Sequence, residues 1–95
     1  MDVLSDSEIE AGLAQLEGWR RRGPSIRKQY QFPSFMDGIA FVNRIAELAE
    51  AADHHPDIMV TWRRVTISLS THSEGALTHK DLQLAGQIES TAQSG

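Results

Sequence analysis

The chain of 95 residues has a formal net charge of −4 and 40% hydrophobic residues, which indicates one domain over residues 1–95 with one modest core. The acidic balance argues against direct binding of nucleic acid, and the absence of cysteine excludes disulfides, thiolate nucleophiles and cysteine-based metal sites. No apolar run approaches the roughly 20 residues that span a membrane, and the acidic start Met1–Asp6 lacks the order of a signal peptide, so we expect a cytoplasmic protein with no membrane partner.

A capping box opens the first predicted helix. Ser5 can accept a hydrogen bond from the amide of Glu8, while the Glu8 carboxylate can reach back to the amide of Ser5. Apolar residues then recur at helical spacing, and Gly18 is suited to a left-handed cap. We therefore expect a helix over about residues 6–17.

A basic run, Arg20–Arg22, precedes the turn signal Gly23-Pro24. We expect this run to be short, extended and solvated at the turn, rather than an anion site. Period-two spacing of apolar residues predicts a strand over Ile26–Phe32, which would form a hairpin with the segment before it.

The longest predicted element is a helix over about residues 35–53. It carries two adjacent apolar stripes, whereas an ordinary surface helix carries one. A chain of this length buries only roughly 60–65% of its unfolded surface. We therefore expect the second stripe to make an oligomer contact in a homodimer or homotetramer; its members are Phe41, Ile45, Leu48 and Ala52.

Two further strands are expected over Ile58–Trp62 and Val65–Thr71. The second strand alternates cleanly, with its apolar residues toward the core, so His72 would follow on its polar side. Thr78 and Asp81 then form another capping pattern, which predicts a last helix to about Gln93.

The element order α-β-β-α-β-β-α, with hairpin-length connections, predicts an α+β fold. Its four-stranded antiparallel sheet would have the three helices packed on one face.

Titratable residues gather where the long helix is expected to end. Pro56 biases His55 away from the α-region, so His54 and His55 should lie at the C-terminal end of the helix. Glu50 and His54 are four residues apart, which allows a hydrogen-bonded pair on one helix face. The spacing alone fits a surface contact at least as well as a site. However, His72 also lies at an element end, where sites are usually built.

Metal binding and nucleophilic catalysis are the alternatives to proton transfer at this junction. Histidine nitrogens and the Glu50 carboxylate could bind a metal, but neighbouring residues such as His54 and His55 point in different directions, and no His-x-x-x-His pattern is present. No serine lies in a Gly-x-Ser-x-Gly turn, and no glycine-rich phosphate loop exists. We therefore expect general acid–base catalysis by imidazoles, without metal or cofactor.

The full spacing resembles a known family. Glu50 is followed after three residues by His54-His55-Pro56, then after five by Trp62, after nine by His72 and after eight by Asp81. This pattern is similar to the signature of the pterin-4a-carbinolamine dehydratases, and the resemblance extends from the first helix to about Ile88. The family implies the same α+β fold, and dehydration of 4a-hydroxytetrahydropterin to the quinonoid dihydropterin in tetrahydrobiopterin recycling.

The resemblance also implies roles for the site residues. His54 and His72 would donate and accept protons near the hydroxyl-bearing carbon, and His55 would position the pterin and act as the base. Glu50 would contact the substrate or orient a histidine. Trp62 and Asp81 would be substrate-binding positions. Trp62 would form a wall of the pocket, and Asp81 would hold a histidine or a pocket loop.

Some of these residues could instead have a purely structural role. Asp81 lies where a capping box favours an acid, Trp62 could belong to the core, and His79 is expected on the surface. The chain also departs from the family, with Ile58 where an aromatic is common and Lys80 where arginine is common. Lysine lacks the planar fork of arginine for bidentate contacts.

Two other functions remain open. The fold could serve as a non-catalytic interaction module, because some relatives are associated with dimerisation of a transcription factor, or it could act in another pterin pathway such as molybdopterin metabolism. The presence of all three motif histidines favours the dehydratase.

Overall fold

The computed structural model describes residues 3–94, so the first two residues of the acidic N-terminal segment and Gly95 lie outside the described residues. The element order is the predicted one and confirms the α+β class. In chain order the elements are α1 (Asp6–Leu13), β1 (Arg20–Arg22), β2 (Ser25–Gln31), α2 (Phe35–Ala52), β3 (Asp57–Thr61), β4 (Arg64–Leu69) and α3 (His79–Ser94).

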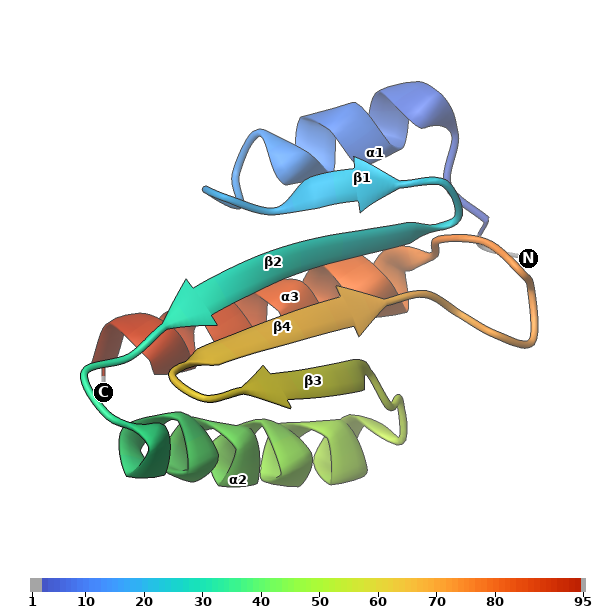
Figure 1. Cartoon of the computed structure of the whole chain (residues 1–95). Coiled ribbons are helices and arrows are strands. Elements are labelled where there is room, and N and C mark those ends of the chain that lie inside the picture. The colour runs from blue at the N-terminus through green and yellow to red at the C-terminus, as the bar shows by residue number, and fades with distance from the viewer. Residues whose placement is uncertain (1–2, 95) are drawn as a thin grey trace.

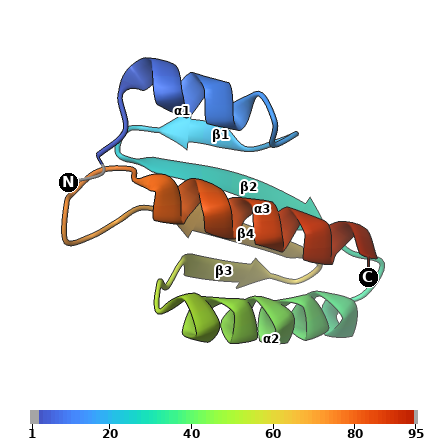
Figure 2. The same cartoon turned by 180° about the vertical axis from the view of Figure 1, so that it is seen from behind.

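The four strands form one antiparallel sheet in the order β1-β2-β4-β3. The pairing of β2 with β4 is the longest and runs from Ile26 opposite Leu69 to Gln31 opposite Arg64. Figure 2 shows α3 lying across the sheet, with α1 and α2 flanking it beside the two edges. Figure 1 shows that the opposite face of the sheet carries no helix.

The core is formed by apolar residues that recur at every second position in the strands and at helical spacing in the helices. In β4 the inward side chains are fully buried, while their neighbours in the chain are partly or fully exposed. They pack against α2 and α3, which places helix side chains over the middle of the sheet. The fully buried side chains of this core include Ile26, Phe41, Ile45, Val65, Ile67, Leu69, Ala85 and Ile88.

The oligomer contact expected at the second stripe of the long helix is not available there. Phe41 and Ile45 are fully buried in the core of the same chain, and Leu48 packs against that core. The helix buries most of this second stripe because it contacts β3, β4 and α3 at once, and of its four members Ala52 is the exposed one. Among the large apolar side chains of this helix, Phe35 and Met36 at its first turn are the exposed ones.

One helix boundary needs correction. The first helix ends at Leu13 rather than near residue 17, because the chain tightens into i→i−3 turns with Gln15 N–H bonded to the Gly12 carbonyl. The basic run forms β1 and pairs with β2, which confirms the predicted hairpin, and Gly23 with positive φ makes the turn between them. Arg21 points toward α1 and pairs with Asp6.

Candidate active site

The end of α2 separates two neighbouring histidines. Asp53 caps the helix in the left-handed conformation, with φ 50°, and its N–H bonds the carbonyls of Ala49 and Glu50. Aspartate is one of the few non-glycine residues that adopt this conformation readily. The reversal buries His54, which is only 9% exposed, and leaves His55 on the surface.

His54 is held by a carboxylate from the first turn of α3. Its Nε2 lies 2.6 Å from Oδ1 of Asp81, and Asp81 is completely buried. The two residues are 27 positions apart in the chain. The packing of α2 against α3 therefore creates the pair.

Two threonines complete the surroundings of Asp81. The Thr71 hydroxyl donates to Oδ2 over 2.8 Å, and the amide of Thr78 donates to the same oxygen over 3.0 Å. Because the Thr71 hydroxyl proton is used on the carboxylate, the 2.7 Å contact between the two hydroxyls has Thr78 as donor. The amide of Lys80 in turn donates to the Thr78 hydroxyl, so the hydrogen bonds form one directed chain that ends at Asp81.

The network fixes the tautomer of His54. Every partner of Asp81 on Oδ2 is a donor, so the group acts as a carboxylate that only accepts. The short contact at Oδ1 therefore requires a proton on Nε2 of His54, which leaves Nδ1 as a proton acceptor when the ring is neutral. A second proton on Nδ1 would be balanced by the charge of Asp81. This arrangement suits a group that accepts and returns a proton.

Glu50 pairs with His55 rather than with His54. The distance from Glu50 Oε2 to His55 Nε2 is 2.5 Å, and the two side chains are 77% and 58% exposed. The expected pairing of Glu50 with His54 is therefore wrong in this structure. The helix ends at Ala52, and the left-handed residue after it takes His54 off the helix face on which the i, i+4 rule depends.

His72 belongs to the loop between β4 and α3, and this loop lies at the same end of the molecule as the connection from α2 to β3 (Figure 1). His72 follows Thr71 of the Asp81 network and opens a turn in which its carbonyl accepts from the amide of Gly75. Its side chain is exposed and makes no hydrogen bond or ion pair with the residues that the structure describes. It is thus accessible to a ligand.

Trp62 is not beside the histidines. It lies in the turn between β3 and β4, at the opposite end of β3 from the His54-His55-Pro56 segment, and β3 spans about 16 Å. Its side chain is 68% exposed, its φ is 52°, and the Arg63 guanidinium lies 4.3 Å from its ring centroid. The interpretation of Trp62 as a core residue is wrong, and Trp62 is not among the residues that line the cavity beside His54.

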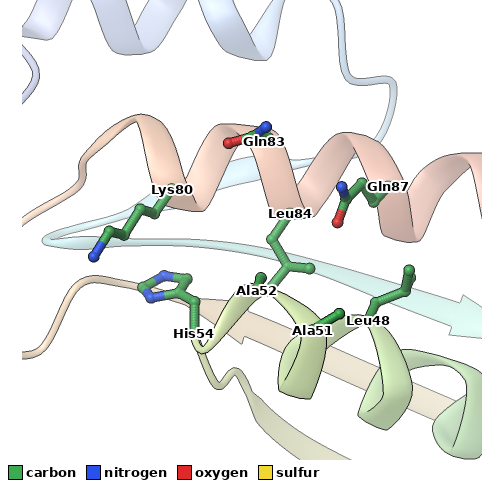
Figure 3. A pocket seen from close by; sticks show the side chains of 8 residues that line it. All are labelled: Leu48, Ala51, Ala52, His54, Lys80, Gln83, Leu84 and Gln87. Atoms are coloured by element: carbon green, nitrogen blue, oxygen red, sulfur yellow. The ribbon is translucent and has the colours of Figure 1, made fainter.

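A cavity of about 360 Å³ adjoins His54 (Figure 3). It lies between the C-terminal half of α2 and the first half of α3, with His54 and Lys80 together at one end. Its volume is within the range of small-molecule sites. The lining combines apolar side chains from both helices with a few polar groups: Leu48, Ala51, Ala52, His54, Lys80, Gln83, Leu84 and Gln87.

The histidines do not converge on one point. His79 is exposed at the first residue of α3, as expected, and His54 and His55 diverge after Asp53. Within residues 3–94, no three histidine or acidic side chains lie close enough together to hold a metal ion. None of the helices in that range is long and apolar enough to cross a membrane.

Sequence reasoning missed Thr71, and it recognised Thr78 only as a cap. The signal for Thr71 was its parity: it continues the inward series of Val65, Ile67 and Leu69, and it is buried. A threonine at an inward position needs a hydrogen-bond partner, because burying an unpaired hydroxyl is costly. That requirement could have pointed to Asp81.

The fold and the His54–Asp81 pair define a small α+β protein with a buried histidine–carboxylate pair at one end of its sheet. The family model described as Pterin 4 alpha carbinolamine dehydratase matches residues 2–91. The chain belongs to the pterin-4a-carbinolamine dehydratase family, as its motif spacing predicted.

Close relatives carry the provisional name pterin-4-alpha-carbinolamine dehydratase. A protein of Roseiflexus castenholzii is 59% identical over 87 residues, covering 92% of this chain and 94% of the relative. A protein of Mycobacterium sp. strain KMS is 53% identical over 89 residues, covering 94% of this chain and 95% of the relative.

Two solved structures share the fold. A transcriptional coactivator/pterin dehydratase from Brucella melitensis superposes with a TM-score of 0.92 at 31% identity, covering 96% of this chain and 99% of its own. A pterin dehydratase-like protein described as a RuBisCO assembly factor in the alpha-carboxysome has a TM-score of 0.66 at 23% identity, covering 81% and 89%. The second similarity concerns the fold alone.

Proposed function

We propose that the chain, as one domain over residues 1–95, is a cytoplasmic hydro-lyase that dehydrates 4a-hydroxytetrahydropterin to the quinonoid dihydropterin, in tetrahydrobiopterin recycling. Membership of the family supports the reaction class, and the relatives named above carry the same activity in their provisional names. The observation that carries the proposal is the buried His54–Asp81 pair at the end of a ligand-sized cavity.

The reaction requires one proton in and one proton out. An acid protonates the hydroxyl on the substrate carbon, and the carbon–oxygen bond breaks to release water. A base removes the N–H proton of the adjoining ring nitrogen, and the electron pair of that bond forms the new carbon–nitrogen double bond. Only protons are exchanged with the protein, so the proposed reaction uses no cofactor.

Three imidazoles could share this work. His54, with Nε2 committed to Asp81, presents Nδ1 for proton exchange, and His72 is the second proton donor or acceptor. His55 positions the pterin and serves as the base, with Glu50 orienting its ring through Nε2. Histidines suit both roles because their unperturbed pKa is close to neutrality.

A stopped-flow dehydration assay tests the proposal. His54→Ala, His55→Ala and His72→Ala should each lower the rate by about 10²-fold or more. His79→Ala is the matched control, because this histidine is exposed and outside the motif. Rates that stay unchanged in the three motif variants, with the fold intact by circular dichroism, would contradict a catalytic role.

Self-association is a second proposal, supported by a separate surface. Phe35, Met36 and Trp62 are all exposed, and the first turn of α2 and the β3–β4 turn lie at the same end of the molecule (Figure 1). The Phe32 amide bonds the Arg63 carbonyl and ties the two segments together. Large exposed apolar side chains gathered at one place indicate an interface.

We propose that this surface, Phe35, Met36 and Trp62, contacts a second copy in a homodimer or homotetramer. Light scattering across a range of concentrations should show an oligomer that Met36→Lys and Trp62→Lys dissociate. A monomer at high concentration would rule it out. A non-catalytic protein that only binds partners would retain this surface. It would have no dehydration activity, so the histidine substitutions would change no rate.

A further inference from the structure

Three arginines share the open face of the sheet. Arg20 and Arg22 lie on β1, and Arg27 lies on β2. Ile26 and Tyr30 on β2 are buried in the core, so the alternate residues Arg27 and Gln29 point to the face that carries no helix. Direct cross-strand partners share a face, which places Arg20 with Arg27.

The strand register brings the three side chains close together. Arg20 is directly opposite Arg27, and Arg22 is opposite Ser25, one step further along the same face. Directly opposed Cβ atoms are about 5 Å apart and diagonal neighbours about 7–8 Å apart. The three guanidinium groups can therefore reach one point in space.

Among the described residues, no carboxylate forms an ion pair with these three arginines. The side chains of Arg20, Arg22 and Arg27 make no hydrogen bond or ion pair with any residue between positions 3 and 94. Arg21, which points to the other face, bonds the Asp6 carboxylate over 2.7 Å and the Gly23 carbonyl over 3.1 Å. The acid in the same cross-strand row is Asp57, two strands away from Arg27.

Like charges directly opposite each other destabilise a sheet, so this arrangement carries a cost that an external anion would remove. A shallow cavity of about 450 Å³ lies over the cluster, and Gln29 and Thr66 add polar groups to its lining. No aromatic side chain lines the cavity. Its chemistry therefore recognises charge and oxygen acceptors rather than a ring system.

Contrary to the expectation that the basic run is only solvated, we infer that this cavity binds a small anion that bears two or three linked phosphate groups. It is lined by Gly18, Arg20, Arg22, Arg27, Lys28, Gln29 and Thr66. Guanidinium groups match phosphate oxygens in a bidentate geometry. The net charge of −4 on the whole chain opposes a long polyanion and favours a ligand small enough to stay within the cluster. This site lies on the open face of the sheet and is independent of the proposed dehydratase function.

Titration with inorganic pyrophosphate and tripolyphosphate at 0.15 M salt tests the site by calorimetry and by amide chemical shifts. Saturable binding should perturb the amides of residues 18–23 and 25–29 and of Thr66. Arg20→Gln and Arg27→Gln should each weaken binding by roughly tenfold or more. Arg21→Gln removes the same charge from the neighbouring position on the other face, and it should bind as the wild type does.

A thermal shift gives a second readout. Pyrophosphate should raise the Tm of the wild type and of Arg21→Gln, and it should raise that of Arg20→Gln and Arg27→Gln much less. A nucleoside triphosphate should bind no more tightly than tripolyphosphate, because the site reads phosphates alone. The inference is overturned by an absence of saturable binding, by equal loss in Arg21→Gln, by chemical shifts confined to the His54 cavity, or by recognition that depends on the base.

Discussion

The two ends of α3 each carry a carboxylate that collects several hydrogen bonds, but the partners differ in kind. Asp81, at the first turn, receives hydrogen bonds from two threonines and from His54. Glu89 lies eight residues later, about 12 Å along the helix. It receives bonds from Tyr30 over 2.6 Å, Lys28 over 2.8 Å, Trp19 over 3.3 Å and Gln93 over 3.1 Å.

The difference lies in whether a partner can change its charge near neutral pH. Lysine side chains in general are cations at that pH, and burial together with the hydrogen bond to Glu89 raises the pKa of Tyr30 well above its usual range. The charges in the Glu89 cluster therefore stay the same near neutral pH, and its hydrogen bonds join β2 to α3. Among the side chains bonded to Asp81, His54 is the one with a second ring nitrogen that can exchange a proton. One carboxylate anchors the fold, and the other can support proton transfer.

Asp81→Asn should have the largest effect. Thr71 and Thr78 both donate to Oδ2, so the amide oxygen of asparagine would face them and its NH₂ would face His54. His54 would then have to accept on Nε2 and carry its proton on Nδ1, which is the wrong tautomer. We expect the dehydration rate to fall by about 10²–10⁴-fold in stopped-flow assays. An unchanged rate would remove Asp81 from the mechanism.

Glu89→Gln, in contrast to Asp81→Asn, should lower the stability of the fold and leave the dehydration rate unchanged. The substitution removes the charge that Lys28 and Tyr30 bond, and a hydrogen bond to a charged group contributes about 1.5–3 kcal/mol. We expect the free energy of unfolding to drop by about 2 kcal/mol in urea titrations, at constant m-value. A loss of activity in the folded variant would show that the two ends of α3 are coupled.

Thr71→Val should give a smaller kinetic effect, because it removes one donor to Asp81 and keeps the shape of the side chain. We expect a decrease of about tenfold in the dehydration rate, in keeping with one hydrogen bond to a charged group. Thr71→Ser retains the hydroxyl and serves as the control. If valine and serine variants have the same rate, Thr71 acts only in packing.

The pH dependence of stability should show the smallest effect. Burial raises the pKa of Glu89, but the hydrogen bonds from Lys28, Tyr30 and Gln93 outweigh it, so the net pKa is lowered. A lowered folded-state pKa means that its stabilisation is complete above the unfolded pKa of about 4.3 and is lost as pH falls through the folded value. Tm measured from pH 7 to pH 3 should fall below about pH 4.3, and less steeply in Glu89→Gln.

Local patterns were sufficient to predict the fold. Alternation in Val65–Leu69 fixed which face is buried, and the capping pairs Ser5 with Glu8 and Thr78 with Asp81 form as predicted. Boundaries were less accurate because they depend on single residues, such as the i→i−3 turns after Leu13. Nothing in the residue pattern distinguished these turns from another turn of α-helix.

Contacts within the site were harder to predict, because they depend on residues far apart in the chain. The spacing of Glu50 and His54 predicted a pair that a single left-handed residue prevents. The contact of His54 with Asp81 follows from the packing of two helices, and the family resemblance implied only that Asp81 supports a histidine or a loop. The predicted strand over Ile58–Trp62 already implied that Trp62 lies far from His54 within one chain, and only the family resemblance suggested a shared pocket.

The left-handed backbone at Asp53 gives two adjacent histidines different surroundings. His54 and His55 are identical in composition and adjacent in sequence, yet one is enclosed beside a buried anion and the other is in contact with solvent. Their ring protons should therefore exchange with water at very different rates, and their nitrogen resonances should be separately assignable. The backbone conformation of one residue thus places two identical side chains in different chemical environments.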